Sequence, residues 1–173
     1  IAGLIILGGL GFIVINDIYI KKIQPRLKKE TRGHLNLHSS IVLKMTLFLL
    51  VLGTVLFFVL EYDNTLQGHS FFEKLNISFF QSASARTAGF AAVDMGQTHD
   101  VTKLSTIFLM FIGAAPASTG GGLKVTTFII LISTVVSVIR GYDDTILSKR
   151  RIDKAIVYRA LTILGLAFLV VFV

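Results

Sequence analysis

Two short stretches of this chain carry residues that could bind a cation, and the first, from Phe79 to Phe90, reads F-F-Q-S-A-S-A-R-T-A-G-F. A cation leaves water only where carbonyl oxygens replace its hydration shell, and glycine allows the backbone dihedrals that aim such carbonyls at one axis. Thr87, Ala88, Gly89 and Phe90 are therefore a candidate cation filter. In isolation the string is weak evidence, because an ordinary turn has the same composition.

The second stretch runs from Gly113 to Lys124 and reads G-A-A-P-A-S-T-G-G-G-L-K. Pro116 lacks a backbone N–H and clashes with the preceding helical turn, and each glycine costs ~1 kcal/mol in a helix interior relative to alanine. The stretch predicts an unwound loop between two helical pieces. Its candidate residues are Gly113, Ala114, Ala115, Pro116, Ala117, Ser118, Thr119, Gly120, Gly121, Gly122 and Lys124.

The elements that must position these stretches follow from the apolar pattern, which predicts segments at 1–19, 41–60, 104–139 and 155–173. A helix of ~20 residues crosses a hydrocarbon core of ~30 Å, so the second segment fits directly. As one helix the third would run ~54 Å, so it must tilt or break. Residues 73–85 would span ~20 Å, which predicts a re-entrant half-helix that enters the membrane and ends at the candidate filter.

Composition indicates a membrane protein, with 53% hydrophobic residues, 16% charged residues and a mean hydropathy of +0.76. Soluble domains are nearer ~25% charged. The net charge is +7, but the basic residues cluster at the ends of apolar segments rather than on one folded face, which argues against nucleic acid as a partner. The absence of cysteine excludes disulfides, thiolate metal sites and cysteine nucleophiles.

The charges of the connections predict the topology. Residues 20–40 and 140–154 are rich in lysine and arginine, whereas residues 61–103 carry an excess of acids. Because cytoplasmic loops of membrane proteins are enriched in basic residues, we expect the two basic connections to face the cytoplasm and the acidic one to face outside. The chain begins and ends inside apolar runs, so we expect it to be a piece of a longer polypeptide.

Three motifs together resemble the membrane subunit of the Trk/Ktr/HKT superfamily of potassium transporters, most of all its bacterial KtrB branch. They are S-A-R-T-A-G-F, the later F-I-G-A-A-P-A-S-T-G-G-G-L-K-V-T-T-F, and the opening G-G-L-G-F-I-V-I-N-D-I, and the resemblance covers nearly the whole chain. That family has four helix, pore-loop, helix repeats fused around a pseudo-fourfold pore. The resemblance implies an all-α membrane fold divided into the end of a preceding inner helix (1–19), a basic cytoplasmic linker (20–40), a complete repeat (41–139), a second cytoplasmic linker (140–154) and the first helix of the next repeat (155–173).

The resemblance also implies a function, which is K⁺ uptake across the plasma membrane of a bacterium by a multi-pass protein that is not an enzyme. Thr87, Ala88 and Gly89 would hold K⁺ through backbone carbonyls, and residues 113–124 would be the intramembrane loop that gates the pore. No covalently bound cofactor is expected, and a role for Na⁺ stays open. The implied partners are a second copy of the membrane subunit in a homodimer and an RCK-type nucleotide-binding regulatory subunit, while anionic lipid is the simpler partner for Lys21 to Arg32.

Some residues have two interpretations. The family loop reads G-A-S-P-G-S-T-G-G-G, so Ala115 and Ala117 replace a serine and a glycine here, with the loss of one hydroxyl and some backbone freedom. Lys124 either takes part in the gate by bonding loop carbonyls or competing with the cation, or it extends toward the cytoplasm. Arg86 either anchors the loop through carbonyls or an acid such as Asp94, or lies on the outer surface.

Two other functional classes are open to comparison. A tetramer of two-span potassium channel chains would normally carry T-V-G-Y-G, and the tandem Gly-x-Gly is missing here because Ala91 follows Phe90. An intramembrane enzyme would need a nucleophile paired with a base, yet the predicted spans contain no histidine or glutamate and only Asp17 as a carboxylate. Asp17 is instead expected to cap a helix or pair with a basic residue at the cytoplasmic end.

Overall fold

The computed structural model describes residues 1–24, 33–142, 144–147 and 150–172. Parts of the two predicted cytoplasmic linkers, namely residues 25–32, 143 and 148–149, therefore lie outside the described residues. The elements are α1 (Ala2–Leu10), α2 (Phe12–Ile18), a π-helical turn η1 (Tyr19–Ile23), α4 (Leu37–Leu60), α5 (Phe71–Thr87), α6 (Asp100–Phe111), α7 (Val125–Ile139), the strands β1 (Ile146–Leu147) and β2 (Arg150–Arg151), and α8 (Lys154–Phe172). The fold is helical, as predicted, apart from the short antiparallel hairpin of β1 and β2, which was not predicted.

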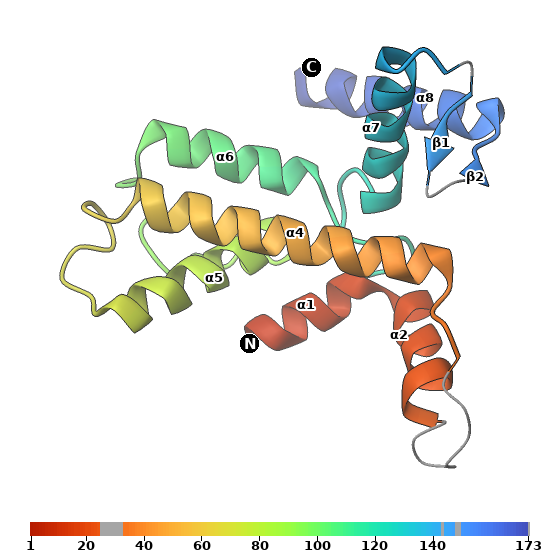
Figure 1. Ribbon diagram of the computed structural model, residues 1–173. Helices are drawn as coiled ribbons and strands as arrows, with labels where there is room; N and C mark the ends of the chain where they lie inside the picture. Colours follow the sequence, from red (N-terminus) through yellow and green to blue (C-terminus); the bar gives the residue numbers. More distant parts are fainter. Residues whose placement is uncertain (25–32, 143, 148–149, 173) are drawn as a thin grey trace.

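Helix α4 is the central element of the molecule. It has 24 residues, and within the described residues it is the one continuous helix long and apolar enough to cross a membrane. Helices α5 and α6 lie along it, and α1 packs against α5 (Figure 1). Gly53 allows α5 to approach closely, because a Cβ there would collide with the hydroxyl of Ser82. The Ser82 hydroxyl donates to the carbonyl of Leu50 (2.9 Å). A hydrogen bond therefore joins α4 and α5 beside Gly53, where the small residues allow the two helices to pack closely.

The helix predicted over residues 73–85 is observed as α5, with 17 residues. Its start is fixed by a capping box, in which the Ser70 hydroxyl accepts from the Glu73 amide and the Glu73 carboxylate accepts from the Ser70 amide (2.9 Å). At 1.5 Å per residue α5 is about 25 Å long, which is shorter than the ~30 Å of a hydrocarbon core. The helix therefore has the length to enter a bilayer without crossing it.

The predicted break in the segment 104–139 is present, because α6 ends at Phe111 and α7 begins at Val125. The first apolar segment differs from the expectation of one inner-helix end over 1–19. It is bent by 95° between α1 and α2, and Gly11 at the bend has φ +79°. A Cβ at Gly11 would lie 2.6 Å from the carbonyl oxygen of Pro116, so only glycine allows this segment and the loop to approach so closely.

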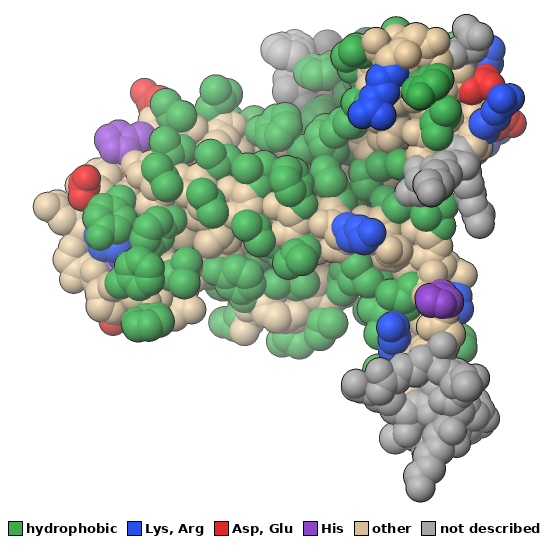
Figure 2. Space-filling model, viewed as in Figure 1, with side chains coloured by type: hydrophobic (Ala, Val, Ile, Leu, Met, Phe, Trp, Pro, Cys, Tyr) green, Lys and Arg blue, Asp and Glu red, His purple; other side chains and the backbone are tan. Residues whose placement is uncertain are grey.

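The surface agrees with a lipid environment. Hydrophobic side chains are distributed along α4 in the visible face, whereas most acidic and basic side chains lie toward the ends of the molecule (Figure 2). Along α4 the exposed side chains include Leu47, Phe48, Val51, Val55 and Val59. Contiguous apolar surface of this kind is rare on soluble monomers and is typical of protein that contacts a membrane or another protein.

Candidate functional site

The candidate filter lies at the end of α5, where Thr87 is the last helical residue. The amides of Ala88 and Gly89 both donate to the carbonyl of Ser84, at 2.9 and 3.0 Å, and Gly89 has φ +70°. The carbonyl of Phe90 accepts a hydrogen bond from the Ser84 hydroxyl. The carbonyls of Ala88 and Gly89 accept none from any described residue.

This geometry separates the filter residues into two groups. No donor among the described residues bonds the consecutive carbonyl oxygens of Ala88 and Gly89, which leaves both available to a ligand, whereas that of Phe90 accepts from Ser84. The helix end adds a partial negative charge close to the free oxygens, which favours a cation over an anion. Ser84 was not among the predicted site residues, and its only sequence signal is a hydroxyl five residues before the glycine.

The loop from 112 to 124 is folded back on itself by backbone hydrogen bonds. Ile112 and Leu123 form a parallel bridge, in which the Gly113 amide donates to the Leu123 carbonyl (2.9 Å) and the Leu123 amide to the Phe111 carbonyl (3.1 Å). Gly113 is required here, because a Cβ would overlap the carbonyl of Gly121. The side chains of Ile112 and Leu123 are buried, so the two ends of the loop belong to the hydrophobic core.

The loop is also bonded to the bend between α1 and α2. Three backbone hydrogen bonds join them: Ala115 N to Gly9 O (3.0 Å), Thr119 N to Gly8 O (3.4 Å) and Phe12 N to Ala117 O (3.0 Å). Each broken helix thus satisfies backbone groups that the other leaves free, which is how unwound backbone is tolerated at membrane depth. Gly8, Gly9 and Gly11 were not among the predicted site residues, although G-G-L-G inside an apolar segment is the same kind of signal as Gly120 to Gly122.

Within the loop, Ala117 has φ +56°, the left-handed region that favours glycine. Ser118 donates its hydroxyl to the Ala115 carbonyl and accepts from the Gly120 amide (3.4 Å). Lys124 precedes α7, and its ammonium donates to the Gly120 carbonyl. Lys124 therefore contacts a loop carbonyl, which is one of the two interpretations given above.

Arg86 connects the candidate filter helix to the loop. Its guanidinium Nη2 donates to the carbonyl of Gly113 (3.4 Å), and the side chain is buried. Asp94 is not its partner, because that carboxylate accepts from Gly96 and Gln97 in its own turn. No acid among the described residues forms an ion pair with Arg86. The surface interpretation of Arg86 is therefore wrong, and the carbonyl interpretation is confirmed.

The ends of α4 are fixed by two polar clusters. At its start, Asp17 pairs with Lys21 (3.0 Å) and accepts from the backbone amide (2.9 Å) and side-chain amide (3.0 Å) of Asn36. The predicted pairing of Asp17 with a basic residue is confirmed. The cluster joins the end of α2 to the start of α4 and so helps to position the bend that holds the loop.

The second cluster, which the sequence reasoning missed, surrounds Glu61 directly after α4. This carboxylate is fully buried and accepts from four partners: Thr102 Oγ1, His99 N (2.9 Å), Thr65 Oγ1 (2.9 Å) and Asn64 Nδ2 (2.8 Å). Burial raises the pKa of Glu61, but these hydrogen bonds outweigh it, so the pKa lies below its ordinary value of 4.5. Glu61 thus ties the end of α4 to the start of α6.

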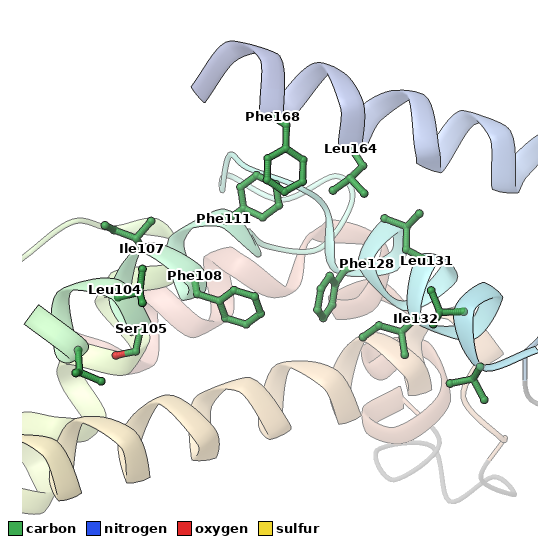
Figure 3. Close-up of a pocket in the computed structure, with 13 residues that line it drawn as sticks. Leu104, Ser105, Ile107, Phe108, Phe111, Phe128, Leu131, Ile132, Leu164 and Phe168 are labelled. Atoms are coloured by element: carbon green, nitrogen blue, oxygen red, sulfur yellow. The ribbon is translucent and has the colours of Figure 1, made fainter. Parts of the chain in front are cut away.

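A wide groove of about 900 Å³ lies between α6, α7 and α8 (Figure 3), and its lining includes Phe111, whose carbonyl belongs to the backbone bridge of the loop. Phe108 points toward Phe128 across it, with ring centroids 6.4 Å apart, and Phe111 contacts Phe168. Among the described residues that line it, Ser105 is the one with a polar side chain. A dehydrated cation needs oxygen ligands, so this groove is not suited to ion passage.

Known proteins resemble the chain along its whole length. A family model described as TrkH, cation transport protein, matches residues 1–173. The Ktr system potassium uptake protein B of Bacillus subtilis is 36% identical over 98% of this chain and 37% of its own length, and that of Vibrio alginolyticus is 40% identical over 95% and 35%. The potassium/sodium uptake protein NtpJ of Enterococcus hirae is 40% identical over 94% of this chain and 35% of its own length.

This chain therefore spans a little over a third of the length of these relatives. The crystal structure of the potassium transporter TrkH from Vibrio parahaemolyticus matches 95% of this chain and 34% of that chain, with a TM-score of 0.70 and 18% identity. At this identity the likeness supports the fold alone. The predicted membership of the Trk/Ktr/HKT superfamily is confirmed. The matching family is one of transporters, not of enzymes. The chain belongs to the TrkH family of cation transport proteins.

Proposed function

We propose that this chain supplies one quarter of the selectivity filter of a potassium uptake transporter, together with the loop that gates its pore. The observation that carries the proposal is the pair of free carbonyls at Ala88 and Gly89, which follow the end of a half-membrane helix. Thr87 is proposed as a further backbone ligand, and Phe90 shapes the filter from its bonded position. The four-repeat fold, with residues 41–139 as one complete repeat, would provide the other quarters.

The gate belongs to the same proposal. Residues 113–122 with Lys124 would close the pore beside the filter, since Arg86 joins the end of the filter helix to Gly113 and Lys124 holds Gly120. The hydrogen bonds between the loop and the α1–α2 bend are backbone contacts between elements, so their release would not remove any hydrogen bond within a helix. Opening would then consist of the release of these bonds.

The ion and the partners follow from what the relatives' names say of those proteins. Two are potassium uptake proteins of a Ktr system, and one is a potassium/sodium uptake protein, which supports K⁺ as the cargo here and leaves a place for Na⁺. A Ktr system has further components, which supports an RCK-type regulatory subunit at the basic connections 20–40 and 140–154. A homodimer in a bacterial plasma membrane, with anionic lipid at the basic connections, completes the proposal.

A tetramer of short two-span chains is the alternative. The relatives are single chains nearly three times as long as the matched region, which favours fused repeats over four identical subunits. Native mass spectrometry of the transporter separates the two assemblies, because fused repeats predict a dimer of large chains.

Replacement of Gly89 by serine in the transporter that contains this chain tests the filter. A side chain at φ +70° costs about 1–2 kcal/mol, so the turn should relax and move the carbonyls of residues 88 and 89. We expect lower discrimination of K⁺ over Na⁺ in uptake by potassium-starved cells. Gly68→Ser is the matched control, because Gly68 also has a positive φ (+86°) and open space around it but lies between α4 and α5. Equal discrimination in both variants and the parent would reject the filter.

A further inference from the structure

A small cavity lies between α1, α4 and α5, beside the end of the filter helix. It has a volume of about 10 Å³ and is lined by Ile5, Ile6, Gly9, Thr46, Leu50, Ala83 and Arg86. Two of its polar atoms, Thr46 Oγ1 and Arg86 Nε, are fully buried and have no hydrogen-bond partner among the described residues. The relative exposures of the two residues are 5% and 8%, so bulk solvent cannot serve either atom.

The energetics of these two atoms call for a ligand. A buried hydroxyl without a partner costs about 1–3 kcal/mol, and a charged donor costs more. A cavity that is polar and has about 10–15 Å³ for the centre of a water molecule holds one water, whereas dry cavities are apolar. Water is also the small ligand that fits both atoms, because its oxygen accepts from the guanidinium N–H while it donates to or accepts from the threonine hydroxyl.

We propose that this cavity is a binding site for a single water molecule, which bridges Thr46 of α4 and Arg86 of α5. The water holds the Nε side of the guanidinium, while Nη2 on the other side holds the Gly113 carbonyl. Thr46 is therefore a positioning residue, since it acts on the loop only through the water and Arg86. The water site stands on the cavity alone, whereas its effect on gating rests on the proposed function.

Density maps of the complete transporter, at a resolution that shows ordered water, test the site. We compare the parent protein with Thr46→Ser, which keeps the hydroxyl, and Thr46→Val, which has the same shape without it. Density in the cavity of the parent and of Thr46→Ser but not of Thr46→Val supports the proposal. A cavity without density in the parent overturns it, whatever the variants do.

Transport by the same variants tests the positioning role. Loss of the neutral hydrogen bond between the Thr46 hydroxyl and the water should loosen the hold of Arg86 on Gly113 and raise unstimulated K⁺ influx on the order of threefold to tenfold in Thr46→Val. Thr46→Ser should restore the parent rate. Thr54→Val is the control, because its hydroxyl bonds the Leu50 carbonyl within α4 and does not line the cavity. Unchanged influx in Thr46→Val, or the same rise in Thr54→Val, overturns the positioning role even where the water is seen, and neither result depends on the selectivity of Gly89→Ser.

Discussion

Replacement of Ala117 by glycine is expected to stabilise the protein, which is an unusual result for a change to glycine. Ala117 has φ +56°, and an L-residue in this region costs about 1–2 kcal/mol that glycine does not pay. Glycine also increases the entropy of the unfolded chain, which opposes the gain by about 0.4–1 kcal/mol. The methyl is exposed, so little burial is lost, and the carbonyl still accepts from Phe12. The difference predicts a net stabilisation of about 0.5–1 kcal/mol.

The control for this prediction is Ala115→Gly in the same loop. Ala115 is fully buried and its φ is not positive, so glycine there removes a buried methyl worth about 0.8 kcal/mol and relieves no strain. We expect the unfolding midpoint of the purified transporter to rise for Ala117→Gly and to fall for Ala115→Gly. If both variants shift the midpoint in the same direction, the backbone of residue 117 does not carry the strain assigned to it.

Two further predictions concern the carboxylate after α4 and the loop. Glu61→Gln should lower the free energy of unfolding by about 1–3 kcal/mol at neutral pH, because it disturbs a buried acceptor with four partners. Since the folded pKa of Glu61 lies below 4.5, this stabilisation is complete above that value and is lost as the pH falls through the folded pKa. Unfolding midpoints across acidic pH should therefore fall more steeply for the parent than for the variant, and parallel curves would contradict this role. Deletion of residues 117–121 should raise K⁺ flux, because it removes the carbonyls that bond Phe12 and Lys124, and parent-like flux and regulation would exclude the loop from gating.

Local sequence patterns predicted where the helices lie in the chain better than they predicted the contacts between helices. The half-helix α5 and the break between α6 and α7 were predictable, because length limits and the proline and glycine residues act within one segment. The apolar pattern of residues 1–19 predicts only a span, and it does not predict the bend at Gly11. The close approach of the Pro116 carbonyl that requires this glycine comes from residues far away in the chain.

The polar contacts between elements were the least predictable part. Glu61 reads as one acid of an outer connection, yet its partners come from a turn four residues on and from the start of α6. The sequence allowed either a buried or a surface position for Arg86, because the burial of its side chain depends on α1 and α4 as well as on its own helix. The position of Gly89 just after the end of α5 could be predicted from sequence because it is a local feature, whereas the bond that ties Phe90 to Ser84 could not, and the role of this turn as a filter stays a prediction.

In the proposed filter a dehydrated potassium ion contacts the backbone at residues 88 and 89. Anomalous diffraction from crystals of the complete transporter soaked with Rb⁺ or Tl⁺, which replace K⁺, measures this directly. We expect an anomalous peak on the pore axis, coordinated by the carbonyl oxygens of Ala88 and Gly89. Well-ordered density for this turn with no peak beside it, or with the peaks only elsewhere in the protein, would rule out this ion site.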